Sequence, residues 1–113
     1  MEYTVERWWN EAKFGLFIHW GLYSLLAGEY DNRKTENIAE WILHDLNIPL
    51  PVYRHLACEF DPTGFDAEAI VKLAKETGMK YIVFTSKHHD GFALYRSNIS
   101  RYNCVETSPF SRD

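Results

Sequence analysis

The amino-acid sequence predicts an α/β fold in which two parallel strands are separated by helices. Two apolar runs, residues 14–18 and 81–85, are rich in β-branched and aromatic side chains and do not alternate with polar ones. Such runs are typical of strands that are buried on both faces of a parallel sheet. A capped helical pattern that ends in glycine directly precedes the second run, as in the second half of a βαβ unit.

The composition limits the classes of partner. The 113 residues are 46% hydrophobic and 16% aromatic, which favours a folded domain over a disordered chain. A net charge of -4 gives no basic face, so we expect neither nucleic acid nor a membrane surface as partner, and a small neutral or polar molecule instead. No apolar run approaches the roughly 20 residues that span a bilayer, and residues 1–6 lack the features of a signal peptide. The chain as written is expected in the cytoplasm, with a secreted or periplasmic parent left open.

The first elements surround the run at residues 14–18. Thr4 is placed to cap a short helix that contains Trp8 and Trp9. The run itself ends in His19 and Trp20, and residues 21–33 carry glycines and the pair Asp31-Asn32. This composition predicts an excursion loop.

Two helices are expected in the middle of the chain. Thr35 is placed to cap a helix that has Glu36 in its first turn and runs to about Asp45, with Glu40 beside its apolar stripe and Trp41 within that stripe. Two prolines then end this helix, and the second of them, Pro51, is expected at the first position of a helix that continues through Leu56.

The clearest helical pattern follows. Asp66 is placed as its N-cap, and Gly78 stands where a left-handed residue ends a helix. Between them, one apolar stripe is formed by Ile70, Val71, Leu73 and Ala74.

Histidines follow both predicted strands. His19 and Trp20 follow the first, and His88 and His89 follow the second, so the four side chains are expected at the same edge of the sheet, where α/β folds bind ligands. Imidazoles exchange hydrogen bonds with hydroxyl groups, act as bases or bind metals, and an indole offers an apolar face to a sugar ring. His44 and His55 are expected to be buried structural residues.

A metal centre is disfavoured. Three histidines and Glu40 supply the ligand types that zinc prefers. In an extended segment, however, the adjacent His88 and His89 point to opposite sides and hardly reach one ion together. Cys58 and Cys104 have no metal-binding spacing, and we expect two unpaired thiols.

Three motifs in order resemble one enzyme family. They are FGLFIHWG at residues 14–21, the pair Glu40-Trp41, and KHHDGF at residues 87–92. Together they look like the amino-terminal part of the α-L-fucosidases of glycoside hydrolase family 29. The resemblance implies that the chain is the amino-terminal portion of a (β/α)8 TIM-type barrel, with its first two parallel strands and the intervening helices, and that residues 1–113 form a partial catalytic domain.

The resemblance also implies the chemistry. The family removes terminal α-L-fucose with retention of configuration, through a covalent intermediate and without a cofactor. By motif, His19, Glu40, His88 and His89 correspond to residues that bind sugar hydroxyls, Trp41 helps to line the pocket, and Trp20 lies beside them. The nucleophile and the acid/base are expected beyond Asp113, so the chain alone is predicted to be inactive. Asp90 is expected to orient its own loop.

Two other interpretations stay open. One is a stand-alone α/β module that binds a sugar or a protein without catalysis, and a weaker one is a metal-dependent hydrolase. A barrel of this type takes about 250 residues, so we also expect open sheet edges through which the chain self-associates.

Overall fold

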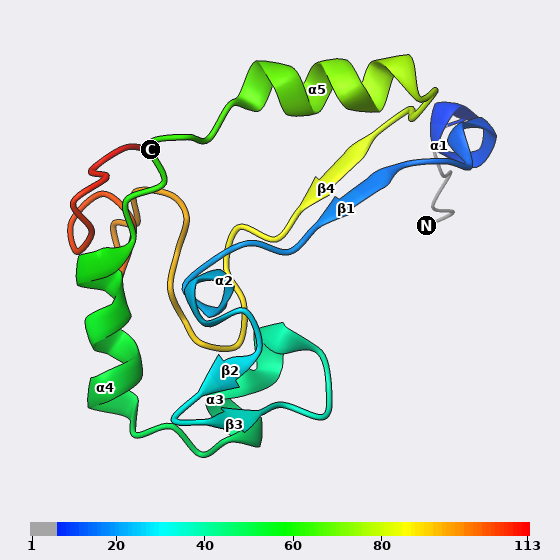
Figure 1. The fold of residues 1–113 in the computed structure, drawn as a ribbon. Helices are drawn as coiled ribbons and strands as arrows, with labels where there is room; N and C mark the ends of the chain where they lie inside the picture. Colours follow the sequence, from blue (N-terminus) through cyan, green and yellow to red (C-terminus); the bar gives the residue numbers. More distant parts are fainter. Residues whose placement is uncertain (1–6) are drawn as a thin grey trace, which may run out of the picture. The chain divides into compact units, whose positions relative to one another are not determined.

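The computed structural model describes residues 7–113, which divide into two compact units. Within the described residues, the first unit contains residues 7–18 and 64–84, and the second contains residues 19–63 and 85–113. The chain passes from the first unit to the second, back to the first, and again to the second (Figure 1). Thr4, the expected cap of the first helix, lies outside the described residues.

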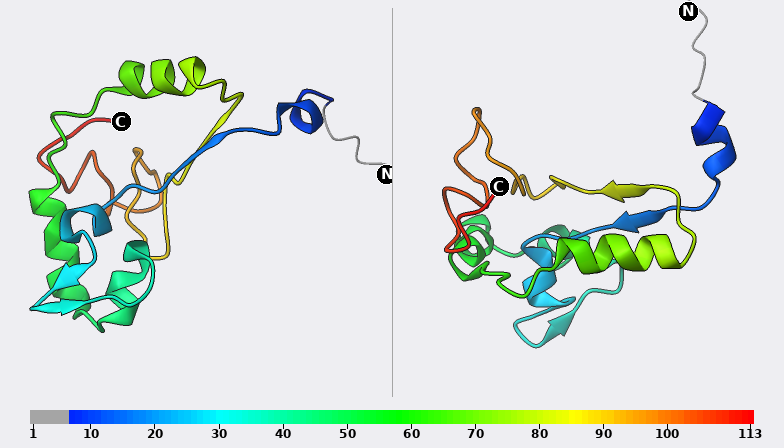
Figure 2. Two further views of the ribbon diagram at one scale, coloured as in Figure 1. Left: turned by 45° about the vertical axis from the view of Figure 1, so that its right-hand side comes forward. Right: turned by 90° about the horizontal axis from the view of Figure 1, so that it is seen from above.

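The first unit is built on a parallel strand pair. β1 (Leu16–Ile18) pairs with β4 (Ile82–Phe84) in parallel, with Phe17 opposite Val83. The predicted parallel pairing is therefore confirmed, although each strand is only three residues long. Figures 1 and 2 show helix α5 (Ala67–Glu76) alongside the pair, and helix α1 (Arg7–Ala12) before β1.

The entry to the strand pair is closely packed. The ring of Trp9 in α1 lies 4.7 Å from the ring of Tyr81, measured between centroids. Gly15 faces the same tyrosine, and a Cβ atom at this position would collide with its ring. Glycine at position 15 thus allows the backbone to pass Tyr81 on its way into β1.

Helix α5 has the ends that the sequence predicts. The carboxylate of Asp66 accepts a hydrogen bond from the Ala69 amide at 2.9 Å, so Asp66 is the N-cap. Gly78 has a φ of 85° and follows the last turn as the left-handed residue.

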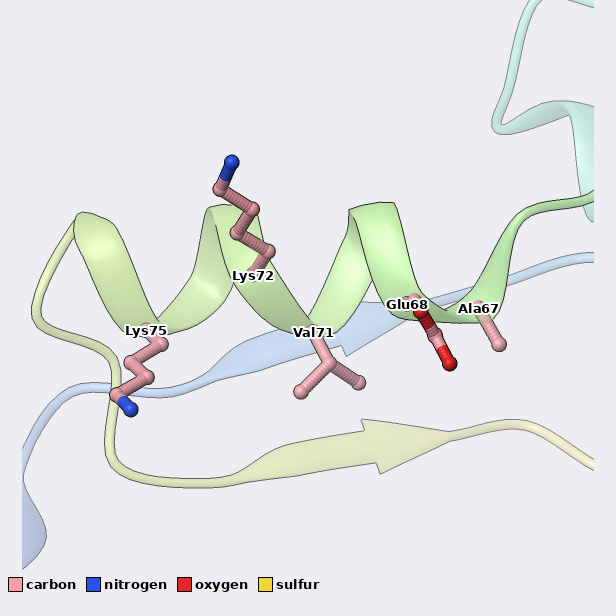
Figure 3. Close-up of a pocket in the computed structure, with 5 residues that line it drawn as sticks. All are labelled: Ala67, Glu68, Val71, Lys72 and Lys75. Carbon is pink, nitrogen blue, oxygen red and sulfur yellow. The ribbon is translucent and has the colours of Figure 1, made fainter.

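The apolar side chains of this unit are more exposed than the sequence predicts. On α5, Ala74 is buried, whereas Val71 and Leu73 are 55% and 60% exposed. Figure 3 shows Val71 in a shallow hollow whose other lining residues are Ala67, Glu68, Lys72 and Lys75. On the strands, Phe17, Ile82 and Phe84 are exposed as well, so the expectation of strands buried on both faces is wrong for this chain. The described residues of this unit leave much of the apolar surface of its strands and helix uncovered.

The second unit contains a hydrophobic core. Its buried side chains come from segments far apart in the sequence and comprise Leu22, Tyr23, Ile42, Leu46, Ile48, Tyr53, Ala57, Phe60, Phe92, Cys104 and Val105. Cys104 is buried and Cys58 is exposed, and both thiols are free, as predicted.

The predicted loop at residues 21–33 contains regular structure. Helix α2 (Tyr23–Leu26) is followed by a hairpin of β2 (Glu29–Tyr30) and β3 (Arg33–Lys34). Asp31 and Asn32 form its two-residue turn with φ values of 51° and 57°. Two consecutive positive φ angles are typical of a type I′ turn, whose twist matches that of a hairpin.

The helix predicted from Thr35 to about Asp45 is shorter and split. A 3₁₀ turn η1 (Ala39–Trp41) leads into α3 (Ile42–Asp45). Thr35 does not cap it: its hydroxyl donates a 2.7 Å hydrogen bond to the Asp45 carboxylate, and Ile38 stands at the N-terminus of η1. The side chain of Thr35 therefore contacts the end of this helical segment instead of its beginning.

The next helix is confirmed with a shift of one residue. α4 (Leu50–His55) begins after Pro49, so Pro51 is at its second position, and a 3₁₀ turn η2 (Leu56–Glu59) extends it. None of the helices within residues 7–113 is long and apolar enough to cross a membrane.

Candidate functional site

The second unit brings five of the six predicted site residues together. His19 is the first residue after β1, Glu40 and Trp41 belong to η1, and His88 and His89 lie in a turn after β4. All of them belong to residues 19–63 or 85–113, so their mutual geometry is defined within one compact unit.

A carboxylate and two imidazoles form one side of the site. The Nε2 atom of His19 lies 3.9 Å from Oε1 of Glu40, and the two side chains are 36% and 18% exposed. The ring of His88 lies 5.3 Å from the ring of His19, edge to face. This side therefore offers a charged acceptor beside imidazole nitrogens, which is a suitable set for hydroxyl groups.

An aromatic stack forms the other side. The rings of Trp41 and His89 are stacked with centroids 4.2 Å apart and planes 10° apart. Nε2 of His89 lies 2.6 Å from the backbone carbonyl oxygen of Glu40. Since a carbonyl oxygen only accepts, Nε2 carries the proton, which fixes the tautomer of a neutral His89. His88 contacts the edge of the same indole, with centroids 5.8 Å apart.

The environment of His88 favours its neutral form. Burial lowers the pKa of His88, and the neighbouring His89 and His19 lower it further, against the smaller effects of Asp90 and Glu40. Its Nδ1 atom is buried without a hydrogen-bond partner among the described residues. A neutral imidazole both donates and accepts, which suits recognition of a hydroxyl group.

A buried carboxylate supports the turn that carries the two histidines. Asp90 is 7% exposed, and its Oδ1 atom accepts a hydrogen bond from the Phe92 amide at 3.1 Å. The Gly91 amide donates to the His88 carbonyl oxygen, also at 3.1 Å, and Gly91 has a φ of 79°. The prediction that Asp90 orients its own loop is confirmed.

Two tyrosines near the site were not singled out from the sequence. The hydroxyl of Tyr53 in α4 donates a 2.7 Å hydrogen bond to Asp90. The ring of Tyr23 in α2 lies 5.8 Å from that of His88, and burial, followed by the charges of Asp90 and Glu40, raises the pKa of Tyr23 to about 12. The backbone of Trp20 lowers the pKa of Tyr23 by a smaller amount. The Tyr23 hydroxyl is buried and has no hydrogen-bond partner among the described residues. Local patterns gave no signal for either tyrosine, because both approach the site through tertiary packing.

Trp20, the sixth predicted site residue, packs against the core. Its ring lies 5.3 Å from that of Phe60 at an interplanar angle of 49°, and it is partly buried. The structure thus places Trp20 next to His19 in sequence and in contact with the hydrophobic core.

Two other histidines differ from expectation. His44 and His55 were expected to be buried, but both are exposed. The side chain of His44 is 78% exposed, lies near the Asp45 carboxylate and contacts the edge of Trp41. Both occupy the last turns of short helices, where a polar side chain reaches solvent.

The adjacent histidines do not point to opposite sides. The segment is a turn and not an extended strand, and the rings of His88 and His89 lie 4.8 Å apart. Nevertheless, within residues 7–113 no group of three or more His, Cys, Asp or Glu side chains is arranged to hold a metal ion.

Comparison with known proteins identifies the family. The model of the α-L-fucosidase family matches residues 1–113. The chain belongs to the α-L-fucosidase family. Among curated α-L-fucosidases, that of Dictyostelium discoideum is 35% identical, over 90% of this chain and 25% of its own length. The human plasma α-L-fucosidase is 34% identical, over 90% of this chain and 23% of its own length. The chain thus spans about a quarter of the length of these α-L-fucosidases.

Solved α-L-fucosidase structures share the fold. The α-L-fucosidase AlfC of Lactobacillus casei in complex with α-L-fucose product is 53% identical, with a TM-score of 0.91 over 94% of this chain and 32% of that chain. A Bacteroides thetaiotaomicron α-L-fucosidase of family GH29, described as a trapped covalent intermediate, is 37% identical. Its TM-score is 0.88, over 93% of this chain and 24% of that chain. The fold described above is therefore that of a segment of α-L-fucosidases.

Proposed function

We propose that this chain forms the amino-terminal part of the catalytic (β/α)8 barrel of a retaining α-L-fucosidase, which removes terminal α-L-fucose from glycoconjugates. Family membership and the similarity to AlfC over a third of that enzyme support this assignment. The parallel strands β1 and β4, connected through helices, are what two successive barrel strands require. On this proposal, residues 1–113 are one partial catalytic domain.

The observation that carries the proposal is the cluster of His19, Glu40, Trp41, His88 and His89. A deoxy sugar presents hydroxyl groups on some positions and an apolar face on others. The Glu40 carboxylate and the imidazoles of His19 and His88 supply acceptors and donors within a few ångströms of one another. The stacked rings of Trp41 and His89 supply an apolar surface with polar edges. The AlfC structure in complex with α-L-fucose supports this choice of ligand. Trp20 is proposed to contribute its indole to the same pocket.

The two catalytic carboxyl groups are proposed to lie beyond Asp113. Retaining hydrolysis requires a nucleophilic carboxylate about 5 to 5.5 Å from an acid/base carboxyl group. Asp90 does not fit either role, because its two oxygens accept hydrogen bonds from Tyr53 and Phe92 inside the unit. Glu40 stands among the hydroxyl-binding groups beside His19. The trapped covalent intermediate of the Bacteroides relative supports a retaining mechanism for the enzyme.

Two assays test the proposal. The enzyme that contains this chain is expected to hydrolyse an aryl α-L-fucoside, and the 113-residue chain alone is expected to show no turnover. Turnover by the chain alone that is abolished by His19→Ala would contradict the placement of the catalytic groups. Tight binding of L-fucose by a stable monomer of the chain would instead support a stand-alone binding module.

A further inference from the structure

The hydrogen bond between Tyr53 and Asp90 links the histidine turn to a separate helix. Tyr53 lies in α4, and Asp90 is 37 residues away in sequence, in the turn after His88 and His89. Tyr53 is fully buried and Asp90 is 7% exposed, so this contact is shielded from water.

The hydroxyl of Tyr53 is a permanent donor. Burial raises the pKa of Tyr53, and the charge of Asp90 and the hydrogen bond to it raise it further. The hydroxyl therefore stays protonated at any pH at which the protein functions. It donates a hydrogen bond of 2.7 Å to Oδ2 of Asp90. A hydrogen bond to a buried carboxylate is among the stronger ones in proteins.

The two carboxylate oxygens of Asp90 accept hydrogen bonds from different donors. Oδ1 accepts from the Phe92 amide and so closes the turn, whereas Oδ2 is held by Tyr53. The same turn presents His88 to His19 and stacks His89 on Trp41. A change in the position of Asp90 therefore moves both imidazoles relative to η1.

We propose that Tyr53 is a positioning residue of the sugar site: its buried hydroxyl fixes Asp90, and Asp90 fixes the turn that orients His88 and His89. The role in sugar recognition rests on the function proposed above. The positioning itself is a property of the unit and is measurable without a sugar.

Tyr102 provides a matched control. Its hydroxyl is also buried, but it has no hydrogen-bond partner among the described residues, and its ring contacts Phe92. Tyr53→Phe and Tyr102→Phe each delete one buried oxygen atom, and only the first deletes a hydrogen bond to Asp90. Asp90→Asn is a second test variant, because it keeps the size of the side chain but weakens the acceptor for Tyr53.

The experiment records the imidazole NMR signals of His88 and His89 in the enzyme and, separately, its affinity for L-fucose. Tyr53→Phe and Asp90→Asn are expected to shift the signals of both histidines, and Tyr53→Phe to weaken L-fucose binding about tenfold, whereas Tyr102→Phe leaves both unchanged. Unshifted histidine signals in Tyr53→Phe, or the same shifts in Tyr102→Phe, would overturn the positioning role. Shifted signals in an enzyme that does not bind L-fucose at all would uphold the positioning and contradict the proposed function instead.

Discussion

Replacing Glu40 with glutamine removes one charge from the proposed sugar site and leaves its shape unchanged. The side chain is 18% exposed, and its Oε1 atom lies 3.9 Å from His19. The hydrogen bond that involves His89 uses the backbone carbonyl oxygen of Glu40 and is retained in the variant. The substitution therefore tests the carboxylate and not the fold around it.

The expected effect follows from the type of hydrogen bond. A hydrogen bond to a charged group contributes about 1.5–3 kcal/mol, against about 0.5–1.5 kcal/mol for a neutral acceptor. Replacing the carboxylate by an amide that still accepts therefore weakens binding by roughly 5- to 13-fold. Removal of the charge also deprives His19 of its acidic neighbour.

Calorimetric titration of the enzyme with L-fucose measures this effect. Glu36→Gln is the control, since Glu36 is exposed in the segment before η1 and its replacement changes the net charge equally. The control is expected to bind like the wild type. Binding by Glu40→Gln within about twofold of the wild type would refute the role of Glu40 as an acceptor in the site.

Three further predictions concern ionisation, stability and association. Burial lowers the pKa of His88 below its usual 6.5, so between the folded pKa and about 6.5 the unfolded chain binds more protons than the folded one, and stability falls as the pH drops through this window. Urea unfolding between pH 5 and 7 should therefore show a weaker pH dependence in His88→Gln than in the wild type. An unchanged pH dependence would contradict this. Asn103 is fully buried, and its side chain makes four hydrogen bonds, with Ser100, Val105 and Glu106. Asn103→Ala should therefore lower the free energy of unfolding by about 2–4 kcal/mol. A loss below about 1 kcal/mol would argue against a stabilising role of these four bonds. The isolated chain should associate through the exposed strands and helix of its first unit, and a monodisperse monomer on size exclusion would contradict that.

Local signals explain which elements could be predicted. Helix α5 has an aspartate cap and a terminal glycine that act within a few residues, and both were found where the sequence places them. The hairpin of β2 and β3 also had a local signal, because Asp31 and Asn32 are residue types that tolerate positive φ. The sequence predicts a loop here from its glycines and the pair Asp31-Asn32, and strands of only two residues leave no alternating pattern that would indicate a hairpin.

Tertiary contacts explain what could not be predicted. Thr35 has the residue type of a helix cap, but its hydroxyl bonds to Asp45 ten positions away. The histidines were expected at one edge because they follow the two parallel strands, whereas Glu40 and Trp41 joined them only through the resemblance of the motifs to a family. The contact of Tyr53 with Asp90 spans 37 residues, and nothing in either local sequence indicates it.

A crystal structure of the enzyme with bound L-fucose tests the central claim most directly. The claim is that the cluster in the second unit is one wall of a fucose pocket. The account predicts hydroxyl groups of the sugar within hydrogen-bonding distance of His19, Glu40 and His88, and its apolar face near Trp41. A sugar bound elsewhere, with these four side chains facing solvent, would contradict it.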